Sequence, residues 1–194
     1  MGNAFKNTTV IPSASNRENR DINEILSRME DWKMVMGARQ HGPSPEQARA
    51  FHPKRYLFDT GVLREFREQA VPSLRLLEKD DPAVRTTLGG VIENQLAIEL
   101  SRGNAPLSGW KKSSAGTEID FIVKQPSHVI PVECKAALRI KGSQLKGILD
   151  YMDHYKLKTG VLISLAPYGI IDCSHGRKVT NLPLYSAGLI TSAT

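Results

Sequence analysis

Carboxylates and a lysine recur at fixed spacing between residues 118 and 135 of this chain, and they are its clearest candidates for chemistry. Side chains alternate between the two faces of a strand, so Glu133 and Lys135 are expected to share one face. If residues 125–128 form a four-residue hairpin loop, antiparallel counting places Asp120 directly opposite Glu133, with Cβ atoms about 5 Å apart. The sequence therefore predicts two facing carboxylates with a lysine beside them.

The apolar residues of the same two strands support this register. The set expected to share the opposite face consists of Ile119, Phe121, Val123, Ile130, Val132 and Cys134. A slip of one residue would break that matched face. Phe121 and Cys134 are therefore expected to be buried beneath the carboxylates.

Two carboxylates that face each other repel unless a cation joins them. Replacing Asp120 with Asn should relieve this repulsion and stabilise the metal-free protein. Oxygen ligands at this separation suit Mg²⁺ (or Mn²⁺), which prefers octahedral oxygen coordination and keeps several water molecules. One of those waters could act as a nucleophile, so the pattern predicts a metal site.

Each candidate also has a structural interpretation, and both interpretations stay open. A Glu-x-Lys pattern on a strand is often a surface ion pair. Glu93 could be a solvated helix residue, because Glu99 lies nearby on the same expected helix. Gln144 could orient a water or a phosphate, or simply lie on the surface. Asp59, before Thr60-Gly61, is typical of a turn.

The elements that must position these residues begin with a helical N-terminal appendage. Residues 1–20 have no apolar period and are expected to form a flexible arm. Asp21 and Glu24 have the spacing of a capping box and are followed by apolar residues at helical spacing, which predicts a helix over residues 21–36. Glycine and proline residues predict a linker over residues 37–53. The main domain is then expected over residues 54–194.

Helices and strands are mixed along this main domain. Expected strands cover residues 55–58, 107–111, 118–124, 129–135, 160–165 and 182–185, and expected helices cover residues 62–69, 87–101 and 142–155. This order predicts an α/β fold.

The residues resemble a known nuclease family. Asp120, then Glu133-Cys134-Lys135 after a hairpin, with Glu93 on a preceding helix, is similar to the PD-(D/E)XK nuclease superfamily, with Ile119 in place of the proline. More narrowly, the chain resembles the uncharacterised C-terminal domain found on many prokaryotic AAA+ ATPases. The motifs that carry this likeness are residues 54–61, 90–94, 116–121 and 131–135, and it spans about residues 21–190.

The resemblance implies a restriction-endonuclease-like core, with a mixed central sheet flanked by helices. Asp120, Glu133 and the carbonyl of Cys134 would hold Mg²⁺ (or Mn²⁺). Lys135 would lie beside the attacked phosphate, and Glu93 would be an auxiliary acid. The resemblance also implies an AAA+ ATPase partner, although the chain has no Walker A loop, because Pro43 stands where the phosphate-binding lysine must be.

The charge of the chain favours a polyanionic partner. Lysine and arginine number 26 against 20 aspartates and glutamates, a formal charge of +6, which promotes nucleic-acid binding through counterion release. The residues expected on the rim of the site are Lys111, Lys112, Arg139, Lys141, Gln144 and Lys146. No aromatic platform accompanies them, which argues against dedicated binding of single strands by base stacking.

Composition sets the remaining expectations. No apolar stretch approaches the roughly 20 residues of a membrane span, so a cytoplasmic protein without a membrane partner is expected. Cys134 and Cys173 are too few for a disulfide framework and are interpreted as reduced core thiols. The expected function is a metal-dependent nuclease acting on DNA or RNA. The alternative is a non-catalytic module that recognises nucleic acid or a protein and works with an AAA+ ATPase.

Overall fold

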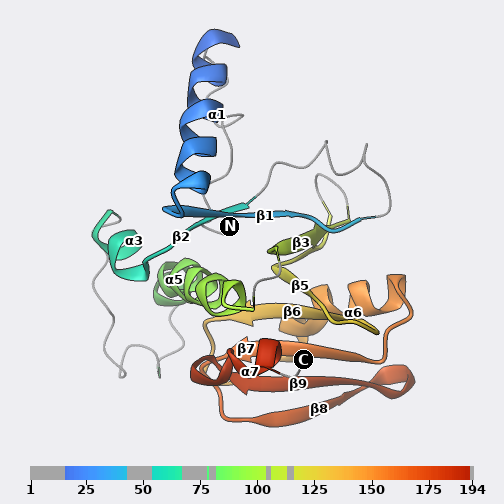
Figure 1. Cartoon of the computed structure of the whole chain (residues 1–194). Helices are drawn as coiled ribbons and strands as arrows, with labels where there is room; N and C mark the ends of the chain where they lie inside the picture. The colour runs from blue at the N-terminus through green and yellow to red at the C-terminus, as the bar shows by residue number, and fades with distance from the viewer. Residues whose placement is uncertain are drawn as a thin grey trace.

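Two mixed β-sheets with helices packed against them make up the α/β fold of the protein (Figure 1). The structure is a computed structural model that describes residues 16–42, 54–66, 78, 82–103, 106–112 and 116–192. The smaller sheet has the strand order β2-β1-β3-β4 and the larger sheet has the order β5-β6-β7-β9-β8. The predicted α/β fold class is thus confirmed.

The larger sheet carries the hairpin that the sequence predicted. Its strands are β5 (Phe121–Lys124), β6 (Val129–Lys135), β7 (Thr159–Ser164), β8 (Gly169–Cys173) and β9 (Arg177–Pro183). In the β5–β6 hairpin Lys124 pairs with Val129 and Phe121 pairs with Val132, which confirms the predicted register. Strands β6, β7 and β9 run parallel to one another, whereas β5 and β8, at the two edges of this sheet, are antiparallel to the strands they pair with.

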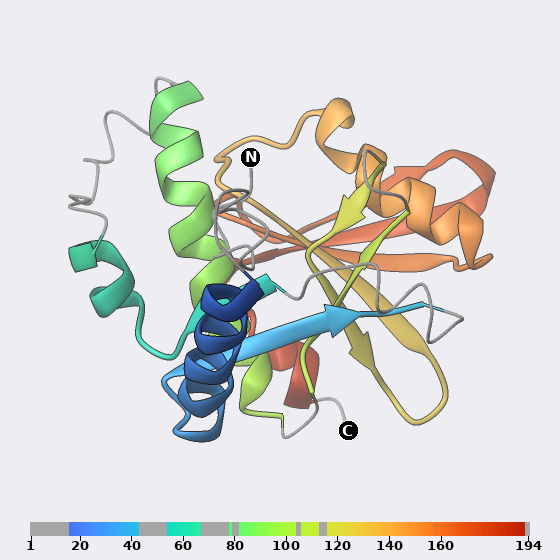
Figure 2. The ribbon, with the colours of Figure 1, turned by 90° about the horizontal axis from the view of Figure 1, so that it is seen from above.

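Two helices cover opposite faces of this sheet, and β6 passes between them in the view from above (Figure 2). On one face α5 (Pro82–Ser101) packs its buried Ile92 and Leu96 against Phe121 and Val132. On the other face lie the 3-10 helix η2 (Gly142–Leu145) and α6 (Lys146–His154), which form the crossover that two parallel strands require. Burial of β6 and β7 on both faces explains why their sequences are nearly continuously apolar.

Two predictions about the N-terminal region are wrong, one for a helix and one for a linker. Helix α1 (Asn16–Asp31) begins and ends five residues earlier than predicted. Lys33 adopts a left-handed conformation (φ 59°), which stops the helix from continuing to residue 36. Residues 37–40, predicted as linker, instead belong to strand β1 (Val35–Gln40). This strand pairs with β2 (Lys54–Leu57) and with β3 (Ser108–Lys111). Residues 1–15 of the predicted arm and residues 43–53 of the predicted linker lie outside the described residues.

A break at Asp120 joins the two sheets. The predicted strand 118–124 is divided into β4 (Glu118–Ile119), which pairs with β3, and β5, which pairs with β6. The break also corrects the predicted apolar face: Ile119 packs with Ile122 beneath α6, whereas Phe121 packs toward α5. Gly109 permits this crossing, because a Cβ atom there would lie 2.8 Å from the carbonyl oxygen of Asp120.

The remaining elements are short. Helix α3 (Thr60–Phe66) follows β2, the 3-10 helices η3 (Ser174–Gly176) and η4 (Leu184–Ser186) flank β9, and α7 (Leu189–Ser192) follows η4. Of the strand predicted at residues 182–185, residues 182–183 end the longer β9 and residues 184–185 lie in η4; β8 was not predicted. Across the described ranges, no helix combines the length and the apolar character needed to cross a membrane.

Candidate functional site

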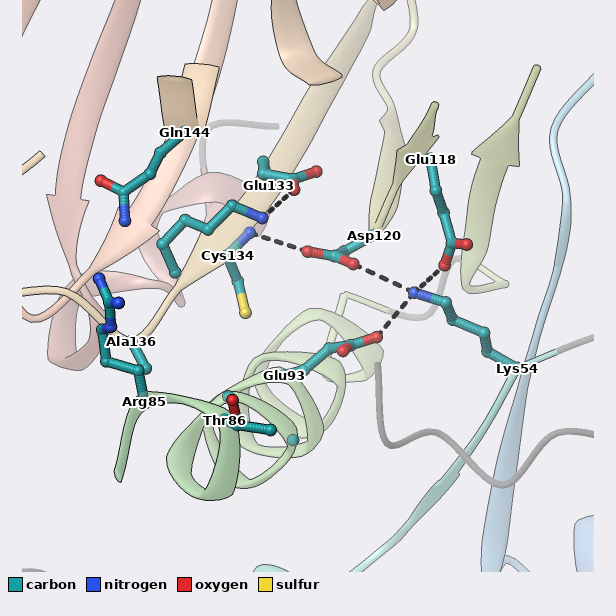
Figure 3. Close-up of a pocket in the computed structure, with 13 residues that line it drawn as sticks. Lys54, Arg85, Thr86, Glu93, Glu118, Asp120, Glu133, Cys134, Ala136 and Gln144 are labelled. Atoms are coloured by element: carbon teal, nitrogen blue, oxygen red, sulfur yellow. Dashed lines mark hydrogen bonds and ion pairs between the residues drawn. The ribbon is translucent and has the colours of Figure 1, made fainter. Parts of the chain in front are cut away.

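A pocket of about 470 Å³ lies where α5 approaches the ends of β4 and β6 (Figure 3). Its lining includes all four predicted catalytic residues together with further polar and basic side chains. These residues are Lys54, Arg85, Thr86, Glu93, Glu118, Asp120, Glu133, Cys134, Lys135 and Gln144. Residues from five separate stretches of sequence therefore meet in one place.

Asp120 sits at the break between the two sheets, with both carboxylate oxygens bound. Its Oδ2 accepts a hydrogen bond from the backbone N–H of Cys134 at 3.0 Å, and its Oδ1 lies 3.1 Å from Nζ of Lys54. Burial alone would raise the pKa of this carboxyl, but Lys54, Lys135 and the Cys134 N–H outweigh burial and lower it. Asp120 is thus held ionised, and its lowered pKa argues against the expectation that Asp120→Asn stabilises the metal-free protein by relieving repulsion.

Glu133 is a buried carboxylate with one oxygen paired and, in the described part of the chain, the other not. Its Oε1 forms an ion pair with Lys135, while its Oε2 is buried and has no hydrogen-bond partner among the described residues. The side chain is 8% exposed. Burial, followed by the negative charge of Asp120, raises the pKa of Glu133 to about 8. An acceptor oxygen that is buried without a donor is costly, so this oxygen is available to a cation.

Lys135 lines the same pocket as Asp120 and Glu133, as predicted. Burial opposes its charge, but the carboxylates of Glu133 and Asp120 outweigh this effect and raise the pKa of Lys135. The lysine therefore stays protonated at neutral pH. Cys134, between these two residues, is buried as predicted, and burial raises the pKa of its thiol.

Lys54 is a pocket residue that the sequence analysis missed. It extends from β2 and places its ammonium nitrogen between Glu93, Glu118 and Asp120 (Figure 3). Its side chain is only 15% exposed. Burial lowers the pKa of Lys54, but the surrounding carboxylates outweigh burial and raise it well above the usual value. Residues 54–61 are one of the motifs that carry the family resemblance. The sequence around Lys54 nevertheless does not indicate its contacts with Glu93 and Asp120, which lie 39 and 66 residues further along the chain.

Glu93 is buried, which excludes the interpretation as a solvated helix residue. Its Oε1 accepts hydrogen bonds from Nζ of Lys54 at 2.9 Å and from the hydroxyl of Tyr56 at 2.8 Å. Burial, together with the charge of Asp120, raises the pKa of Glu93 despite these donors. Lys54 and Tyr56 are two residues apart on β2, so alternation along the strand presents both to the same helix.

Asn94 fixes β2 against α5. Its Oδ1 accepts the backbone N–H of Leu57 at 2.8 Å, and its Nδ2 donates to the carbonyl of Leu57 at 2.9 Å. The amide thus pairs with the strand as a neighbouring strand would. This anchoring holds Lys54 at the pocket.

Of the six residues predicted for the rim of the site, Gln144 lines the pocket and the five basic residues do not. Lys111 lies 3.8 Å from Glu118, and Gln144 lines the pocket while its Oε1 accepts the backbone N–H of Lys141 at 2.8 Å. The other members, Lys112, Arg139, Lys141 and Lys146, are exposed and do not line the pocket. Arg85 on α5 does line it and was missed, since it precedes the helix predicted from residue 87.

The carboxylates of the pocket supply some of the ligands that a divalent metal needs. Within the described ranges, no group of three or more His, Cys, Asp or Glu side chains is arranged to hold a metal ion. The pocket nevertheless contains two neighbouring carboxylates, and one of them has a buried oxygen without a donor. Mg²⁺ is commonly held by one or two protein carboxylates together with waters and substrate oxygens, so these residues fit such an ion.

Residues 88–185 match the model of a family described as a domain of unknown function, DUF4143. This segment covers just over half of the 194 residues. The chain belongs to the DUF4143 family. The segment shared with DUF4143 contains Glu93, Asp120, Glu133 and Lys135, whereas Lys54 precedes it. A search of the curated proteins finds no match to this DUF4143 chain, and neither does a search of the solved structures.

Proposed function

We propose that this protein is a metal-dependent nuclease of the PD-(D/E)XK type, which hydrolyses phosphodiester bonds of DNA or RNA. The observation that carries the proposal is the buried Oε2 of Glu133, which has no donor among the described residues and shares a pocket with Asp120 and Lys135. A fold that buries an acceptor without a donor gains by binding a cation there.

In this proposal Asp120, Glu133 and the main-chain carbonyl of Cys134 hold Mg²⁺ or Mn²⁺. The bound ion would make a coordinated water more acidic and would neutralise charge that develops on the phosphate. The backbone N–H of Cys134 orients Asp120 by bonding to its Oδ2. Asp120 is thereby held in place by β6, the strand that also carries Glu133.

Lys135 acts as a charge stabiliser in this proposal. Its raised pKa keeps it protonated, so it would donate to a non-bridging oxygen of the phosphate and is unsuited to act as a base. Its side chain is 33% exposed, which leaves it accessible to a substrate entering the pocket. The ion pair with Glu133 sets the position of its ammonium group.

A nucleic-acid partner is supported by polar and basic side chains in the pocket and on the segment after β6. Arg85 and Gln144 line the pocket, and the exposed Arg139, Lys141 and Lys146 lie on the segment that follows β6. Contacts from such side chains to phosphates would position a strand without reading its sequence.

A second candidate is a non-catalytic recognition module that works with an AAA+ ATPase. One observation favours it: Lys54 and Lys135 already form ion pairs with all four carboxylates of the pocket without any metal. Under this candidate the charges serve the fold, and the basic residues bind nucleic acid or a protein.

Metal binding and cleavage measured together separate the two candidates. Wild-type protein, Glu133→Gln and Asp172→Asn are titrated with Mn²⁺ and assayed on single- and double-stranded DNA and RNA. Asp172 is a matched control, because its carboxylate is 81% exposed on the edge strand β8. The nuclease proposal expects binding and cleavage in the wild type and the control, and loss of both in Glu133→Gln. A wild type that neither binds Mn²⁺ nor cleaves any of these substrates would refute it.

A further inference from the structure

Three carboxylates surround the ammonium group of Lys54 as ligands surround a bound cation. Nζ lies 2.9 Å from Oε1 of Glu93 and 3.1 Å from Oδ1 of Asp120, and it also forms an ion pair with Glu118. These acidic side chains come from α5, from β4 and from the break that follows β4. The cluster is therefore built around a cation by elements far apart in sequence.

We infer that Lys54 fills a second cation position beside the metal position of Asp120 and Glu133, so that the site takes one divalent ion and not two. This inference rests on the proposed function for the first position. Asp120 belongs to both positions, since one of its oxygens faces Lys54 and its other oxygen accepts the Cys134 N–H. Shared carboxylates of this kind are typical of sites that hold two metal ions about 3.5–4 Å apart.

The charges around Lys54 are those of a divalent cation site. Three carboxylates meet one ammonium group, and Lys111 approaches one of them, Glu118, at 3.8 Å. Glu93 also accepts the hydroxyl of Tyr56, which orients it toward the cluster. Without the ammonium group, the carboxylates would repel one another in a buried setting and would favour a cation.

The distances explain why the cluster is not already arranged for a metal. Hydrogen bonds to an ammonium nitrogen place the Glu93 and Asp120 oxygens 2.9 and 3.1 Å from the centre. Mg²⁺ requires oxygens at about 2.1 Å, so each carboxylate would have to move inward by roughly 1 Å. Lys54 keeps them apart, and Asn94 holds its strand in place through Leu57.

The stoichiometry of Mn²⁺ binding tests this inference. Wild-type protein is expected to bind one Mn²⁺ per chain, and Lys54→Met is expected to bind two, as counted by electron paramagnetic resonance and calorimetry. The additional ion should be lost again in the double variant Lys54→Met/Glu93→Gln, because Glu93 belongs only to the second position. Lys111→Met is the matched control: it removes the other lysine near Glu118 and should still bind one ion.

The outcomes separate the inference from the proposed function. If Lys54→Met binds no more Mn²⁺ than the wild type, the inference is overturned, whether or not the wild type binds an ion. If the wild type binds none and Lys54→Met binds one, the inference is supported and the metal-dependent function is refuted. Lys54→Gln, which keeps a hydrogen-bonding side chain, gives the same readout should Lys54→Met not fold. Two ions bound by the wild type would also overturn the inference.

Discussion

Replacing Asn94 with Ala tests how β2 is held at the pocket. The substitution removes two hydrogen bonds to Leu57 and leaves its backbone N–H and carbonyl without these partners. Asn94 is 2% exposed and Leu57 is 9% exposed, so water cannot easily replace the lost bonds. A buried polar group left without a partner costs about 1–3 kcal/mol, so the free energy of unfolding should fall by about 3 kcal/mol.

Urea unfolding measured by far-ultraviolet circular dichroism provides the assay. Gln95→Ala is the matched control, because Gln95 is the next residue on α5 and its side chain makes two hydrogen bonds, to Thr60 and to Glu99, against three for Asn94, to Leu57 and Thr60. Gln95 is only partly buried, so water can replace these bonds and the expected loss is about 1 kcal/mol or less. If Asn94→Ala costs no more than Gln95→Ala, then Asn94 does not anchor β2 and the reasoning is refuted.

Three further predictions concern the carboxylates and the basic rim. Because the pKa of Glu133 is raised from 4.5 to about 8, its protonated form is favoured by the fold. The contribution of Glu133 to the free energy of unfolding is fully present below pH 4.5 and is lost as pH rises through 8. Melting temperatures measured in EDTA should therefore fall over that range. They should fall less steeply in Glu133→Gln, which cannot ionise. Asp120 has a lowered pKa, so Asp120→Asn should instead lower the melting temperature at pH 7; an increase would show that repulsion dominates. Replacing Lys141 and Lys146 together should reduce the slope of log affinity for duplex DNA against log salt by about two, and an unchanged slope would exclude them as phosphate contacts.

The hairpin could be predicted from sequence because its information is local. Alternation fixes which residues share a face, and a four-residue loop fixes the register, so the positions of Asp120 and Glu133 follow from counting. The face of Ile119 was predicted wrongly, because the alternation of apolar and polar residues over 118–124 gives no sign of the break at Asp120. That break depends on the crossing of β3 at Gly109, which is a tertiary contact.

Two strands and Lys54 were missed, each for a different physical reason. Strand β1 follows a helix whose apolar spacing continues past Asp31, so the helical pattern hid the strand that begins at Val35. Strand β8 lies at a sheet edge with exposed and half-buried residues in alternation, and its apolar signal is weak. Lys54 was missed because a lysine is ordinarily exposed, and only the assembled fold brings carboxylates around it.

The order in which the chain is synthesised determines when the acidic cluster can close. Lys54 bonds to Glu93, which comes 39 residues later, and to Asp120, which comes 66 residues later. Such distant pairs carry a loop-closure cost that is recovered only when the intervening elements have docked. A nascent chain therefore has β2 and α5 available before the carboxylate that joins them to the larger sheet has been made. During synthesis, Lys54 can therefore meet all three of its carboxylates only after Asp120 has been added to the chain.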